Sequence, residues 1–177
     1  MSIFDDLGAE QERLEKILSG LDEAQWASAS AADGWTIADV VLHLAQSEEA
    51  AAVTATHGTL RGGLGTVAGE TMDARADAAV RLERAEPGEV FVRWQRARQA
   101  SLAAMRAADP DQPVQWMVGT LKPATLATTR LAEHWTHGLD ITGPLGISFP
   151  DTARLSHIAW LAHRSLRPST ARFAAVF

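Results

Sequence analysis

Glu133 and His137 stand four positions apart on one predicted helix, and their side chains are of types that bind metal ions. Residues four apart in a helix project from the same face, one turn from each other. A carboxylate oxygen and an imidazole nitrogen at that separation can both reach one divalent cation, and zinc accepts both at about 2.0–2.2 Å. Because two protein ligands seldom hold a metal alone, we expect a third ligand from another helix.

His43 is the best candidate for that third ligand, because its neighbours in residues 40–45 are apolar. Burying an imidazole costs free energy unless it finds a partner. Two histidines and one glutamate would leave a coordination position open for water or substrate, the pattern of a catalytic metal site. The residues alone leave two alternatives open. Glu133 and His137 could form an ordinary surface pair, and His43 could be a core histidine bonded to a carbonyl.

Apolar residues recur mostly at three- and four-residue spacing, which predicts the helices that would position these side chains. Thr36 and Asp39 match a capping box at the start of the helix that carries His43, and Asp151 is the expected cap of the last helix. No run of residues is convincing as a β-strand, and residues 110–122 are expected to be a plain connection. The predicted helices span residues of about 3–19, 36–57, 70–85, 87–108, 125–139 and 151–166. The predicted fold is all-α: a four-helix bundle with additional short helices, in a single domain over residues 1–177.

The composition excludes several classes of protein. With 46% hydrophobic and 21% charged residues the chain is of globular type, and with no cysteine it has no disulfide or catalytic thiol of its own. A formal charge of −6 argues against a broad nucleic-acid-binding face. No apolar run approaches the roughly 20 residues needed to cross a bilayer, and the N-terminus lacks the features of a signal peptide. We therefore expect a cytoplasmic protein that binds neither nucleic acid nor membrane.

Other motifs give little support to other chemistries. Residues 63–68 fit the loose dinucleotide fingerprint G-x-G-x-x-A, but no credible strand precedes them, so a loop is expected. The sequence contains no P-loop, nucleophile elbow or H-E-x-x-H motif. Trp35 and Trp135 are assigned to the core rather than to substrate stacking.

Two segments together resemble the DinB-like superfamily. Residues 34–44 carry W-T-x-x-D-x-x-x-H-L, and residues 130–140 carry E-x-x-x-H-G-x-D, in the expected order. More narrowly, the chain is similar to the actinobacterial branch of mycothiol-dependent maleylpyruvate isomerases and their uncharacterised metal-binding relatives. The similarity extends from about Leu7 to Leu166. It implies a four-helix bundle that holds a divalent metal.

The resemblance implies that the metal ligands are His43, Glu133 and His137, with zinc as the expected metal and nickel as the alternative. It also implies a low-molecular-weight thiol such as mycothiol, bound as a thiolate, and a small-molecule acceptor. Asp140, one turn beyond His137, is a candidate to orient an imidazole, its alternative being a helix-end turn residue. Arg130 is a candidate to bind an anionic substrate, its alternative being a plain surface arginine.

The expected function is therefore that of a metal-dependent thiol S-transferase or isomerase. A non-catalytic metal- or ligand-binding module and a metal-dependent hydrolase are the alternatives. The isomerase that the chain resembles has a second, C-terminal α/β domain with a catalytic arginine, which we expect to be absent from this chain. The sequence leaves the oligomeric state open, although the apolar segment at residues 173–177 favours a partner surface such as that of a homodimer.

Overall fold

A computed structural model describes residues 2–60, 69, 71–117 and 119–165 of the chain. Within these residues the fold is mostly helical, as predicted. The elements in chain order are α1 (Ile3–Leu18), α2 (Glu23–Ala27), α3 (Ile37–His57), α4 (Met72–Leu82), α5 (Pro87–Ala107), β1 (Val114–Trp116), β2 (Gly119–Leu121), α6 (Pro123–Thr142) and α7 (Leu155–Ser165).

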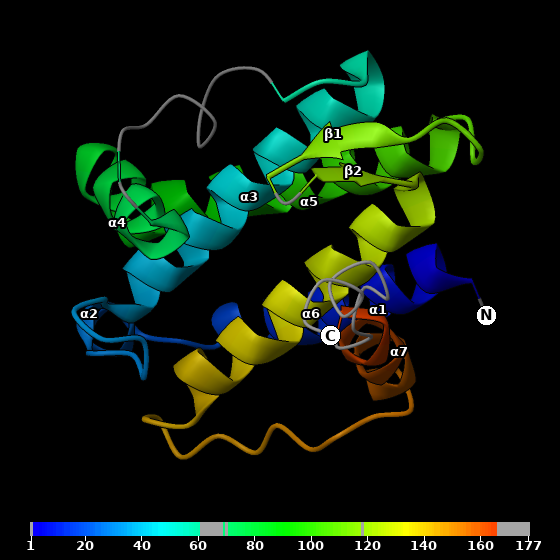
Figure 1. Cartoon of the computed structure of the whole chain (residues 1–177). Helices are drawn as coiled ribbons and strands as arrows, with labels where there is room; N and C mark the ends of the chain where they lie inside the picture. The colour runs from blue at the N-terminus through cyan, green and yellow to red at the C-terminus, as the bar shows by residue number, and fades with distance from the viewer. Residues whose placement is uncertain (1, 61–68, 70, 118, 166–177) are drawn as a thin grey trace, which may run out of the picture.

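The four longest helices, α1, α3, α5 and α6, form the bundle (Figure 1). Helix α3 packs along α5, α1 packs along α6, and α3 also contacts α6. The shorter helices lie outside this bundle, with α4 beside α3 and α7 beside α6. The candidate ligands His43 and Glu133 stand on α3 and α6, so the packing of these two helices decides whether the site forms.

Helix α3 begins and ends where its local sequence requires. The Thr36 hydroxyl accepts a hydrogen bond from the Asp39 backbone N–H at 3.1 Å, and the Asp39 carboxylate accepts one from the Thr36 N–H at 3.0 Å. This reciprocal pair is the predicted capping box. The helix ends at Gly58, whose φ of 74° is a left-handed conformation that glycine adopts without strain. The first turn is thereby fixed, seven residues before His43.

The hairpin of β1 and β2 was not predicted. In place of a plain connection, Val114 pairs with Leu121 and Trp116 pairs with Gly119 in an antiparallel arrangement. Strands of three residues are too short to show an alternating pattern in the sequence. Tertiary contacts hold the hairpin against α3, because the backbone N–H of Gln115 donates to the carbonyl of Gly58 at 2.9 Å.

Two helix boundaries also differ from the prediction. Helix α6 runs from Pro123, which suits the first helical position, to Thr142, so it is longer at both ends than predicted. The last helix starts at Leu155, so Asp151 is not its cap. Residues 152–157 first form tight i→i+3 turns, which delay the helix.

The expectations for residues 63–68 and 173–177 lie outside the described part of the chain. No helix that the structure describes is both long enough and apolar enough to span a membrane.

Candidate metal centre

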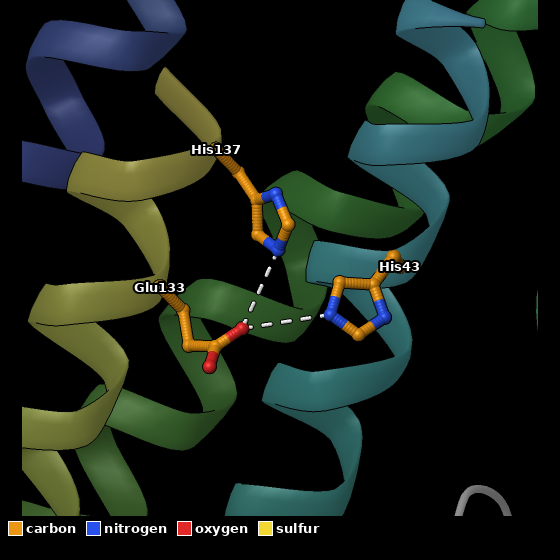
Figure 2. Close-up of side chains that lie close together, drawn as sticks. All are labelled: His43, Glu133 and His137. Atoms are coloured by element: carbon orange, nitrogen blue, oxygen red, sulfur yellow. Dashed lines mark ion pairs between the residues drawn. The ribbon is translucent and has the colours of Figure 1, made fainter. Parts of the chain in front are cut away.

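The three predicted ligands come together between α3 and α6. Figure 2 shows His43 facing Glu133 and His137 across the space between these helices. One carboxylate oxygen of Glu133, Oε2, lies 3.5 Å from Nε2 of His43 and 3.5 Å from Nε2 of His137. One potential ligand atom from each residue lies within 4.8 Å of the other two. The side chains of His43, Glu133 and His137 are 12%, 36% and 16% exposed, so the cluster is sheltered yet reachable.

These separations suit a divalent metal. Zinc–ligand distances of about 2.0–2.2 Å and tetrahedral angles place neighbouring ligand atoms about 3.4 Å apart. Both distances from the Glu133 oxygen to an imidazole nitrogen match this value. The site therefore fits a metal ion held by three protein ligands, with room for at least one more.

Asp140 fixes the side of His137 that faces away from the cluster. Its carboxylate lies 2.9 Å from Nδ1 of His137. Because an ionised carboxylate only accepts hydrogen bonds, Nδ1 carries the proton, and Nε2 of a neutral ring presents its lone pair toward Glu133. An imidazole oriented in this way is the usual state of a metal-ligating histidine. This contact is the one that the expected orienting role of Asp140 requires, and the role itself stays a prediction.

The charges in the cluster favour binding of a positive ion, either a proton or a metal ion, between Glu133 and the two histidines. Burial acts to raise the pKa of Glu133, but its bonds to His137 and His43 outweigh burial and hold that pKa well below its ordinary value. Burial acts to lower the pKa of His137, yet contact with Glu133 and Asp140 raises it overall. For His43 burial prevails, and the pKa is lowered. A metal ion would therefore compete with a proton for this cluster.

A cavity of about 800 Å³ opens beside the triad, lined by residues of α3, α4, α6 and the hairpin. Trp35 lines it, with its ring centroid 5.2 Å from that of His43 and 6.5 Å from that of His137. Its indole N–H donates to Asp77 on α4 at 3.1 Å. Trp35 is half-buried: it packs against the hydrophobic core, as assigned, and it also lines the cavity.

Arg130 is buried rather than a surface residue. Only 4% of its side chain is exposed, and it lines the same cavity, with Nη2 3.8 Å from Oε1 of Glu133. The guanidinium lies over the ring of Trp116 from β1, 5.0 Å from its centroid. Sequence reasoning missed Trp116 because the hairpin that places it was not predicted.

His134, which follows Glu133 in the sequence, makes its hydrogen bonds to groups outside the triad. Its Nδ1 donates to the carbonyl of Arg130 at 2.8 Å, and its Nε2 accepts from the Trp94 indole at 3.3 Å. Burial lowers the pKa of His134 to about 3, so the ring is neutral.

Glu48, on the inner side of α3, is a fully buried acid. One carboxylate oxygen lies 3.6 Å from His134, and the hydroxyl of Ser101 donates to the other. Burial raises the pKa of Glu48 to about 7, against the opposing effect of Arg130. Nothing in the sequence marked Glu48, because the groups that surround it come from α5 and α6.

Comparison with known proteins places these observations in a family. The model of the mycothiol maleylpyruvate isomerase N-terminal domain matches residues 7–142. Two uncharacterised proteins, from two strains of Mycobacterium tuberculosis, are each 32% identical over 161 residues, which cover 90% of this chain. The chain spans 63% of the length of these relatives.

Solved structures show the same fold. The crystal structure of a mycothiol-dependent maleylpyruvate isomerase superposes with a TM-score of 0.63 at 18% identity, over 78% of this chain and 59% of that one. A mutant of that enzyme superposes with a TM-score of 0.60 over the same shares of the two chains. At this identity the match establishes the architecture of the bundle.

Proposed function

The chain belongs to the family of mycothiol maleylpyruvate isomerase N-terminal domains, and we propose that it binds a divalent metal and uses it to activate a low-molecular-weight thiol such as mycothiol. The observation that carries this proposal is the convergence of His43, Glu133 and His137 on one point beside a cavity. Zinc is the metal we propose, with nickel as the alternative. The reaction would then be either transfer of the thiol's sulfur to a small acceptor molecule or isomerisation of that molecule.

A divalent cation at this position would stabilise a thiolate and lower the pKa of the thiol, which supplies a nucleophile at neutral pH. The sulfur must come from a cosubstrate, because the chain contains no cysteine. The protein contributes the three ligands, and Asp140 keeps Nε2 of His137 free to bind.

The cavity supplies the space that a thiol and an acceptor need. Its volume of about 800 Å³ lies within the range of small-molecule sites. Trp35 and Trp116 provide flat apolar walls, and Arg130 provides a buried positive charge. These walls hold a ligand near the triad and limit its contact with water.

Cobalt substitution tests the thiol proposal directly. A thiolate bound to Co²⁺ gives a sulfur-to-metal charge-transfer band in the near ultraviolet, and this chain has no cysteine that could produce the band itself. We expect the band to appear and saturate when mycothiol is added to the Co²⁺-loaded protein. It should be absent with an analogue that carries a hydroxyl in place of the thiol.

The His43→Ala, His137→Ala double variant is the matched control, and it should show no band at any thiol concentration. Cobalt bound by the triad without a band on thiol addition would contradict the thiol proposal. Turnover of an ester or amide by the metal-loaded protein without thiol would favour a hydrolase instead. Metal binding with neither band nor turnover would favour a non-catalytic metal-binding module.

A further inference from the structure

A layer of polar side chains divides the core of the bundle. Each of the four long helices contributes side chains to two separate hydrophobic clusters. On every one of these helices, a buried polar residue stands in the sequence between the residues of one cluster and those of the other. These residues are Gln11 on α1, Glu48 on α3, Arg98 and Ser101 on α5, and His134 on α6. Together with Arg130, one turn before His134 on α6, we call them the polar layer.

Contacts within the polar layer use only part of its hydrogen-bonding capacity. The hydroxyl of Ser101 donates to Oε2 of Glu48, and Nδ1 of His134 donates to the carbonyl of Arg130 at 2.8 Å. The other oxygen of Glu48, Oε1, lies 3.6 Å from Nδ1 of His134, which is too long for a hydrogen bond. These contacts bring groups from α3, α5 and α6 together at one level of the bundle.

Six polar atoms of the layer are buried and have no hydrogen-bond partner among the residues that the structure describes. They are Nε2 and Oε1 of Gln11, Oε1 of Glu48, Nε of Arg98, and Nε and Nη1 of Arg130. The set contains both donors and acceptors. Leaving such groups unsatisfied in the interior is costly, and charged groups most of all. Because these atoms are enclosed, a ligand in the neighbouring cavity cannot reach them, and the missing partner must itself lie inside the bundle.

We propose that the polar layer is a binding site for ordered water, with water molecules enclosed between the two hydrophobic clusters and bonded to the six atoms. Water both donates and accepts hydrogen bonds, so it matches a set that contains amide, carboxyl and guanidinium groups. A buried water makes about three hydrogen bonds, so about two molecules would satisfy these atoms. Each of the two arginines already lies beside a glutamate, so the missing partner need not carry a charge.

Arg130 connects the polar layer with the metal centre. Its Nη2 lies 3.8 Å from Oε1 of Glu133, whose other oxygen faces both imidazoles. Water bonded to Nε and Nη1 holds the guanidinium from inside the bundle, over the indole of Trp116. Water bonded to Gln11 and Glu48 joins α1 with α3. This inference goes beyond the proposed function, because water in the layer requires neither a metal nor a thiol.

NMR of the full chain tests the water site through nuclear Overhauser effects between water and the side-chain amide protons of Gln11. These protons are assigned through bonds from the backbone of Gln11, so the measurement uses the unaltered protein. We expect Overhauser effects of the sign that marks water bound for as long as the protein takes to tumble. Measurement in the rotating frame distinguishes them from exchange of amide protons with the solvent. No such effect at the Gln11 amide would overturn the inference.

Relaxation dispersion of the ¹⁷O nucleus of water provides a second test, because it counts long-lived water molecules. A Gln11→Met variant keeps the length of the side chain but not its polar atoms, and it should hold about one or two fewer such waters than the parent. Gln99→Met, which changes an exposed glutamine on α5, is the matched control and should give the count of the parent.

An equal count in the parent and in a folded Gln11→Met variant would overturn the inference, because the side chains of the layer would then satisfy one another directly. Where that variant does not fold, the Overhauser effects in the parent decide. A chain that binds no metal but shows the bound water would refute the proposed function and leave the water site standing.

Discussion

Replacement of Glu48 by glutamine should change how stability depends on pH. The cost of burying the charged form of this carboxyl group is not fully offset by its contacts with neighbouring groups. Its side chain is fully buried, and burial raises its pKa from 4.5 to about 7. An acid whose pKa is higher in the folded state favours folding most at low pH, where it is protonated in both states. That contribution is lost as the pH rises from the unfolded pKa to the folded one. Glutamine cannot ionise, so the variant escapes the loss.

The size of the effect follows from the two pKa values. At about 1.4 kcal/mol for each pH unit, the interval from 4.5 to about 7 corresponds to about 3 kcal/mol, most of it between pH 5 and pH 8. The free energy of unfolding of Glu48→Gln, relative to the parent, should therefore rise by about 2 to 3 kcal/mol over that range. The substitution also alters the contact with Ser101, but this changes the free energy of unfolding equally at every pH and so leaves its pH dependence unchanged.

Urea unfolding of metal-free protein, followed by circular dichroism at pH 5, 6, 7 and 8, measures this difference. Glu49→Gln is the matched control, since its carboxylate lies on the outside of the same helix and is paired with Arg93. For the control we expect no rise in relative stability with pH. If the difference in free energy of unfolding between Glu48→Gln and the parent is flat, or falls as the pH rises, Glu48 is ionised in the folded protein and its pKa is not raised.

Three further predictions follow from single contacts. Asp140→Asn should weaken zinc binding about tenfold or more, because the amide no longer favours a proton on Nδ1 of His137. Competition with a chelator measures the zinc affinity, and an unchanged affinity would contradict the orienting role of Asp140. Gly138→Ala should lower the free energy of unfolding by about 1–3 kcal/mol, because a Cβ there would lie 2.5 Å from the ring of Phe149. If urea unfolding gives the same free energy for the variant and the parent, the ring moves aside at no cost. Thr36→Ala should cost about 1 kcal/mol through loss of the α3 cap, measured in the same way, and no loss would mean that the cap is not needed.

Much of the fold could be predicted because its causes are local. The capping box at Thr36 and Asp39 marks the start of α3, and glycine at position 58 marks its end. The four-residue spacing of Glu133 and His137 predicts a shared face, which the structure confirms by placing both beside His43. The resemblance to a known family connected His43 with that pair, which spacing alone could not do.

The remainder depends on contacts between distant parts of the chain. Trp116 lines the cavity because a short hairpin is held against α3, and two three-residue strands leave no periodic signal. Arg130 was open to interpretation as a surface residue because its position on α6 does not reveal what covers it. Glu48 was not identified, since its burial is produced by side chains from other helices.

The zinc content of the purified protein, measured after zinc loading and removal of excess metal, tests whether His43, Glu133 and His137 hold a metal ion. We predict about one zinc per chain in the parent and in a His57→Ala control, whose histidine is exposed at the end of α3. No bound zinc is expected in a His43→Ala, His137→Ala variant that keeps the helical circular dichroism of the parent. A parent that binds no zinc or nickel, or a double variant that still binds zinc as tightly as the parent, would contradict the assignment of His43, Glu133 and His137 as metal ligands.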